Sequence, residues 1–117
     1  MSTHKGWIGV DLDGTLAHYG EWQGFAHIGE PIPLMAARVA AWLEAGVDVR
    51  IFTARVGPGK TPEDTQASKD AIDAWTLALF GQTLPVTATK DCNMVQLWDD
   101  RAVQVIPNTG LRVDGHP

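Results

Sequence analysis

The chain alternates short apolar segments with longer segments of helical period, and this alternation limits the folds that it can adopt. Residues 7–11 (WIGVD) are apolar, β-branched and followed by turn-forming residues, which predicts a buried strand. Residues 47–55 predict a second strand, and helical spacing of apolar residues predicts helices over 34–46 and 61–81. Strands joined by helices in this way run parallel, in a sheet covered on both faces. We therefore expect one α/β domain spanning residues 1–117.

The rest of the chain supplies further short strands and two irregular segments. Residues 84–90, 95–100 and 103–106 are short and apolar enough to form strands. Residues 17–33 hold glycines and prolines without periodicity, which predicts an irregular loop or a short hairpin near the site. We expect residues 107–117 to form a loose tail.

Polar residues stand at the carboxyl ends of the main predicted strands. Asp11, Thr53, Lys90 and the pair Asp99–Asp100 fall at the ends of four different strands. Ligands of open parallel sheets bind beyond these ends, so these residues should converge on one crevice. Taken singly, Asp11 reads equally well as a solvated turn residue, and the others read better as a strand-end hydroxyl, a surface lysine and a turn after a strand. Their joint placement, in order along the chain, favours a functional site.

The two aspartates of the motif DLDG (11–14) have a chemistry of their own. Asp11 and Asp13 lie two residues apart, so both side chains can face the crevice. Adjacent carboxylates repel unless a cation lies between them or one is protonated, and Asp99 and Asp100 add negative charge at the same edge. A hard divalent cation with oxygen ligands would relieve this repulsion, and Mg²⁺ is the ion that we expect.

An aspartate is also a nucleophile that needs no general base at neutral pH, and it can form an aspartyl-phosphate. Asp11 could then attack phosphorus, while Asp13 donates a proton to the leaving oxygen and later activates water. Gly14 lets the backbone turn tightly and approach a ligand closely. Thr53 offers a hydroxyl and an N–H to phosphoryl oxygens, and Lys90 offers a positive charge.

These motifs together resemble those of the haloacid dehalogenase-like (HAD) superfamily of phosphohydrolases. The stretch VDLDGTL (10–16) is similar to the first motif of that superfamily, Asp-x-Asp-Gly-Thr after an apolar strand, and IFTAR (51–55) to the second. Lys90 in VTATKD is similar to the lysine of the third motif, and VQLWDDRA (95–102) to the fourth motif. The resemblance spans residues 7 to about 106, nearly the whole chain.

The resemblance implies a Rossmann-like three-layer α/β sandwich with a mainly parallel central sheet and no cap domain. It implies that Asp11 is the nucleophile and Asp13 the acid and base. Mg²⁺ would be held by the Asp11 carboxylate, the Asp13 backbone carbonyl and Asp100, with Asp99 supporting Asp100 or reaching the metal through water. The phosphoryl group would be bound by Gly14, Thr53, Ala54, Arg55 and Lys90.

The chain departs from the pattern of this superfamily at two points. Lys90 stands only nine positions before Asp99, so the usual helix between the third and fourth motifs is missing, and Lys60 or Arg55 could take the place of Lys90. There is also no room for a cap domain. In this respect the chain resembles members of the superfamily that act on bulky phosphates or are covered by a neighbouring subunit. A homodimer would provide such a cover.

We therefore expect a Mg²⁺-dependent phosphomonoesterase acting on a small or bulky phosphorylated substrate. A phosphatase of nucleotides or nucleic-acid ends is the alternative within the enzyme class. A non-catalytic module that binds metal or phosphate is the alternative of another class. The net charge of −5 argues against long nucleic acid held by its backbone, but it leaves a terminal phosphate open.

Two smaller expectations complete the sequence analysis. Trp22 and Phe25 in the irregular loop could stack on a base or sugar, or could pin the loop to the core, and we favour the second. The stretch MSTHKGW at the N-terminus has no apolar signal core, no apolar run reaches the length of a membrane span, and Cys92 has no partner for an internal disulfide. These features predict a cytoplasmic protein without a membrane partner.

Overall fold

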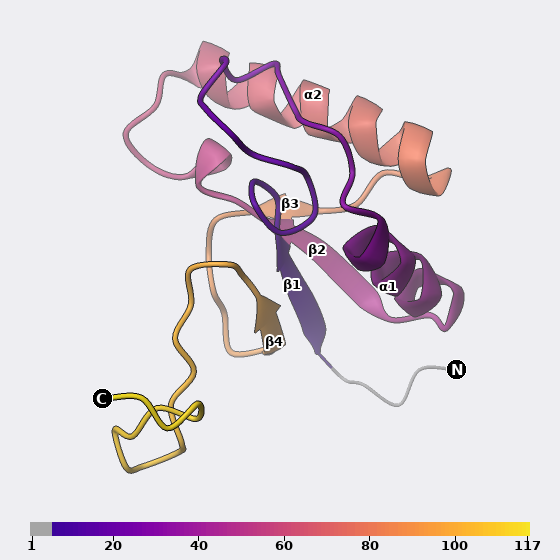
Figure 1. Ribbon diagram of the computed structural model, residues 1–117. Coiled ribbons are helices and arrows are strands. Elements are labelled where there is room, and N and C mark those ends of the chain that lie inside the picture. Colours follow the sequence, from indigo (N-terminus) through magenta and orange to yellow (C-terminus); the bar gives the residue numbers. More distant parts are fainter. Residues whose placement is uncertain (1–5) are drawn as a thin grey trace.

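The computed structural model describes residues 6–117, so most of the N-terminal stretch used above lies outside the described residues. Four strands form one parallel sheet in the order β3-β2-β1-β4 (Figure 1). Their bounds are Trp7–Asp11 (β1), Asp48–Phe52 (β2), Val86–Thr87 (β3) and Met94–Trp98 (β4). The register pairs Asp11 with Phe52 and Val10 with Trp98, so the carboxyl ends of β1, β2 and β4 meet at one edge. This confirms the prediction of an α/β fold with a parallel sheet.

Two helices cover one face of this sheet. Helix α1 spans Pro33–Glu44 and helix α2 spans Pro62–Phe80, and a 3-10 turn, η1, spans Ala54–Val56 after β2. The buried core joins alternate residues of β1 and β2 to both helices; its members include Ile8, Val10, Val49 and Ile51 from the strands and Met35, Val39 and Ile72 from the helices. Burial of these apolar side chains fixes the helices on the sheet, and with them the loops at its carboxyl edge.

The other face of the sheet has no helix among residues 6–117, so these residues form two layers where a three-layer sandwich was expected. Residues 88–93 connect β3 to β4, and a helical crossover needs about a dozen residues or more. Trp7 is nonetheless 1% exposed, because polar side chains cover it. The guanidinium of Arg50 lies 4.7 Å from the centre of the Trp7 ring, and Trp7 Nε1 donates to a carboxylate oxygen of Asp91 at 2.8 Å.

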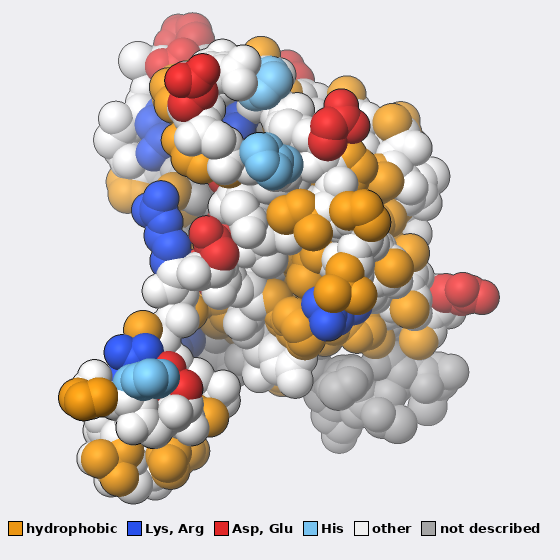
Figure 2. All heavy atoms as spheres, viewed as in Figure 1, with side chains coloured by type: hydrophobic (Ala, Val, Ile, Leu, Met, Phe, Trp, Pro, Cys, Tyr) orange, Lys and Arg blue, Asp and Glu red, His pale blue; other side chains and the backbone are white. Residues whose placement is uncertain are grey.

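The C-terminal residues form an arm instead of a fifth strand. Residues 103–106 do not join the sheet, so this prediction was wrong, and β3 is shorter than the predicted 84–90. Val105 pairs with Arg112 in an antiparallel bridge, and the amide of Ile106 donates to Leu111 at 2.7 Å. The tail therefore turns back on itself and stands apart from the sheet, with hydrophobic side chains at its surface (Figures 1 and 2).

The irregular loop at 17–32 is closed at its base. The amide of His18 donates to the backbone carbonyl of Glu30 at 2.8 Å, and the amide of Ile32 donates to that of Leu16 at 2.8 Å. Ala17 and Pro31 form an antiparallel bridge at the same place. The loop therefore starts and ends at the carboxyl end of β1 and enters α1 directly.

Among the described residues, no helix combines the length and apolarity that crossing a bilayer requires.

Helix α2 begins and ends at the residues that the sequence indicates. The hydroxyl of Thr61 accepts a hydrogen bond from the amide of Asp64 at 3.1 Å, and Pro62 occupies the first helical turn. Gly81 ends the helix with a φ of 75°, a conformation that glycine adopts without strain.

We expect the substitution Thr61→Ala to lower the free energy of unfolding by about 1 kcal/mol, because an exposed amide of the first turn loses its acceptor. For a chain of this size the melting temperature should fall by about 4 °C. Thr61→Ser is the matched control, since it keeps the hydroxyl and should retain most of the stability. Equal losses in both variants, measured by thermal denaturation, would show that the cap contributes little.

Candidate functional site

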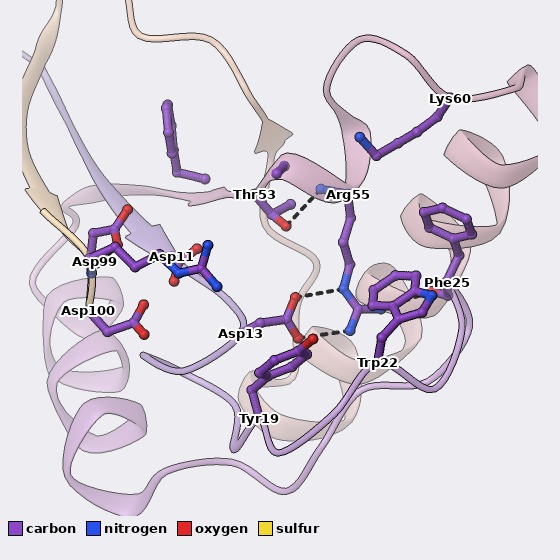
Figure 3. A pocket seen from close by; sticks show the side chains of 13 residues that line it. Asp11, Asp13, Tyr19, Trp22, Phe25, Thr53, Arg55, Lys60, Asp99 and Asp100 are labelled. Atoms are coloured by element: carbon purple, nitrogen blue, oxygen red, sulfur yellow. Dashed lines mark hydrogen bonds and ion pairs between the residues drawn. The ribbon is translucent and has the colours of Figure 1, made fainter.

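The carboxyl edge of the sheet opens into a cavity of about 360 Å³. The residues that the sequence placed at strand ends line it from three strands: Asp11 and Asp13 after β1, Thr53 after β2, and Asp99 and Asp100 after β4 (Figure 3). Their convergence follows from the parallel register, since each side chain lies at the last residue pair of its strand or just beyond it.

Three carboxylates form a cluster in this cavity, which we call the acid cluster: Asp11, Asp99 and Asp100. One oxygen of each lies within 4.8 Å of the others. Burial raises the pKa of Asp11 to about 7, helped by its hydrogen bond to Asp100 and by the charges of Asp99 and Asp100. Oxygen-only ligands, crowded negative charge and partial burial are the donor set that suits Mg²⁺, so the cluster fits the ion that the sequence predicts.

Thr15 holds the acid cluster together and was not singled out from the sequence. Its Oγ1 lies 3.3 Å from an oxygen of Asp11 and 3.4 Å from one of Asp100, and it accepts from the Asp100 amide at 3.0 Å. A hydroxyl has one proton, so it can donate to one carboxylate at a time. The signal was present in the sequence, because Thr15 follows directly on DLDG.

Asp13 faces away from the acid cluster and toward Arg55. The Nε and Nη2 atoms of Arg55 donate to the two oxygens of Asp13, both at 2.8 Å, in a bidentate pair. Nη1 of the same guanidinium donates to the backbone carbonyl of Phe25 at 3.0 Å. Arg55 is 5% exposed, so its donors are committed to protein partners. The two aspartates of DLDG therefore occupy two different environments.

Thr53 is buried between these two environments. Its amide donates to the carbonyl of Thr87 at 2.9 Å, so this N–H extends the sheet and is not free for a ligand. Its hydroxyl accepts from the amide of Arg55 at 3.2 Å and caps η1, and the hydroxyl proton is left to donate. Ala54, exposed at the start of η1, lines the cavity beside it.

Besides Arg55, two cations line the cavity, Lys60 and Arg101, but Lys90 does not. Lys90 is exposed, because β3 ends at Thr87 and the chain turns there, with the amide of Thr89 bound to the Thr87 hydroxyl at 3.0 Å. Lys60, which the sequence left open as a substitute, lies at the rim, as does Arg101. Arg101 forms no ion pair among residues 6–117.

Comparison with known proteins supports the fold and nothing finer. No known protein family matches the sequence, and no curated protein matches it. A solved structure of a conserved protein from Bacteroides thetaiotaomicron is similar, with a TM-score of 0.57 at 18% identity. The similarity covers 96% of this chain and 81% of that one. The likeness is one of fold alone.

We expect Mg²⁺ to raise the melting temperature, because a ligand bound only by the folded state stabilises it. At a free concentration about a hundredfold above Kd the gain is about 2.7 kcal/mol. Asp100→Asn should remove most of this shift. Glu44→Gln, on the exposed end of α1, makes the same charge change elsewhere and should keep it. An unchanged shift in the Asp100 variant would remove that residue from the metal shell.

Gly14 allows a second test of the acid cluster. Its φ is 91°, and a Cβ added there would lie 2.5 Å from an oxygen of Asp100. Gly59 has a φ of 88° with nothing near the added Cβ. Both alanine variants should therefore lose about 1 kcal/mol of stability to backbone strain. Only Gly14→Ala should also weaken Mg²⁺ binding, measured by calorimetry, and equal affinity in the two would contradict the cluster geometry.

Proposed function

We propose that this chain is a Mg²⁺-dependent phosphohydrolase, similar to the HAD superfamily, that works through an aspartyl-phosphate on Asp11. The observation that carries this proposal is the separation of the two aspartates. Asp11 lies in the acid cluster, whereas Asp13 is held apart by Arg55. Groups that divide the work of a nucleophile and a proton carrier need two such environments.

The metal would be held by Asp11 and Asp100, with Asp99 in support and the Asp13 backbone carbonyl added by the family resemblance. When bound there, Mg²⁺ supplies positive charge to the phosphoryl oxygens and to the crowded carboxylates. Its binding also favours the ionised form of Asp11, the form that acts as a nucleophile.

In the first step, an oxygen of ionised Asp11 bonds to phosphorus while the bond from phosphorus to the leaving oxygen breaks. Asp13, protonated from solvent before this step, gives its proton to that leaving oxygen, and its ion pair with Arg55 then forms again. Arg55 occupies one lone pair on each Asp13 oxygen, which leaves another on each for the proton.

In the second step, water attacks the phosphorus of the aspartyl-phosphate and gives a proton to Asp13. The bond from phosphorus to Asp11 breaks, phosphate leaves, and both aspartates return to their starting forms. The Thr53 hydroxyl, which lines the cavity, would donate to a phosphoryl oxygen. We assign the positive charge for the transition state to Lys60, because it lines the cavity and Lys90 does not.

The two aspartates should fail differently when each is replaced by asparagine. Asp11→Asn removes the attacking oxygen, so turnover of every phosphate ester should be lost. Asp13→Asn has no proton to give and also ends the ion pair with Arg55, so turnover of alkyl phosphates should fall by at least about 10²- to 10⁴-fold. Aryl phosphates should lose less, because their leaving groups need less protonation. The measurement is steady-state hydrolysis with and without Mg²⁺.

Asp114→Asn, on the C-terminal arm, is a matched control and should hydrolyse both kinds of ester as the parent does. Turnover by the Asp11 variant, or equal loss of alkyl and aryl esters in the Asp13 variant, would contradict the assigned roles. Binding of Mg²⁺ and phosphate without hydrolysis of any ester would instead favour a non-catalytic module.

A further inference from the structure

The cavity has an aromatic wall beside Asp13 and Arg55, formed by Tyr19, Trp22 and Phe25 of the irregular loop (Figure 3). We propose that this wall binds the base of a nucleoside monophosphate whose phosphate lies at Asp11. The position of the phosphate rests on the proposed function, whereas the binding of the base rests on the wall itself.

The exposure of the wall indicates that it is more than an anchor for the loop. Trp22 is 49% exposed and Tyr19 is 41% exposed, although both rings border a cavity. An indole that served only to pin the loop would gain most by full burial. Other contacts already pin it: Trp75 Nε1 donates to the carbonyl of Gly29 at 3.2 Å, and Arg55 binds the carbonyl of Phe25.

The wall is also held in a fixed relation to the reacting groups. The edge of Phe25 meets Trp22 at 4.9 Å between ring centres and an angle of 77°. The guanidinium of Arg55 lies 5.0 Å from the Trp22 ring while it binds both oxygens of Asp13 (Figure 3). One buried arginine therefore sets the position of the wall relative to Asp13. A ligand with a phosphate and a flat ring matches this arrangement.

Nucleotides fit the chemistry of this cavity better than other aromatic phosphates. Every base has a flat face that stacks on an aromatic side chain. Lys60 and Arg101 at the rim complement a negatively charged ligand. The volume of about 360 Å³ is within the range of small-molecule sites. The net charge of −5 disfavours a long nucleic acid, so a mononucleotide is the ligand that we infer.

The first test compares hydrolysis of adenosine 5′-monophosphate and ribose 5-phosphate, which share phosphate and sugar and differ in the base. Stacking should give the nucleotide a kcat/KM higher by about 5- to 140-fold. Trp22→Leu should abolish this preference, because kcat/KM should fall for the nucleotide far more than for ribose 5-phosphate. Trp22→Phe keeps a flat ring and should retain most of the preference. Parallel loss on both substrates would assign Trp22 a purely structural role and overturn the inference.

The second test needs no turnover, so it separates this inference from the proposed function. Adenosine 5′-monophosphate should quench the tryptophan fluorescence of the full chain, and ribose 5-phosphate should not. Trp22→Leu should lose the quenching, whereas Trp42→Phe, which removes an indole that packs on Trp98 outside the cavity, should keep it. Quenching without hydrolysis would retain the base site and defeat the phosphohydrolase. Hydrolysis without base preference, or nucleotide binding unchanged in Trp22→Leu, would defeat the base site.

Discussion

The site depends above all on the bidentate ion pair between Arg55 and Asp13. Arg55 follows β2, Asp13 follows β1, and the same guanidinium binds the loop through the carbonyl of Phe25. Breaking such a pair would leave an uncompensated charge in a place where Arg55 is 5% exposed, and this is far more costly than losing a surface pair. Two strand ends and the aromatic wall thus share one anchor.

The acid cluster is the opposite case, because its charges lack a cationic partner among the described residues. The raised pKa of Asp11 expresses this cost: burial and the neighbouring carboxylates make its ionised form unfavourable. A bound cation would remove this repulsion, since the same carboxylates would then become its ligands. The Thr15 hydroxyl links two of its members, Asp11 and Asp100.

The two-layer arrangement leaves the candidate site open. Both helices lie on one face, and the short link from β3 to β4 leaves the other face without a helix among residues 6–117. The closed loop over residues 17–32 lies over the site. The cavity therefore stays accessible from solvent, and the loop that shapes it also provides the aromatic wall.

The sequence by itself determined the elements and the polar residues at their ends. Apolar periodicity predicted both helices and the strands of the sheet, because burial of one face acts on local patterns. The parallel order then implied that Asp11, Thr53 and Asp100 would meet, as they do. The functional roles assigned to these residues remain predictions.

Only the tertiary structure decided which side chains meet beyond the strand ends. The guanidinium of Arg55 binds Asp13, so its donors are not free for a ligand. Lys60 lines the cavity and Lys90 does not. Residues 103–106 belong to the C-terminal arm and not to the sheet. Each of these outcomes depends on the path of the chain after its last sheet hydrogen bond. That path is set by contacts between residues far apart in sequence, such as Arg55 with Phe25, and periodicity carries no information about them.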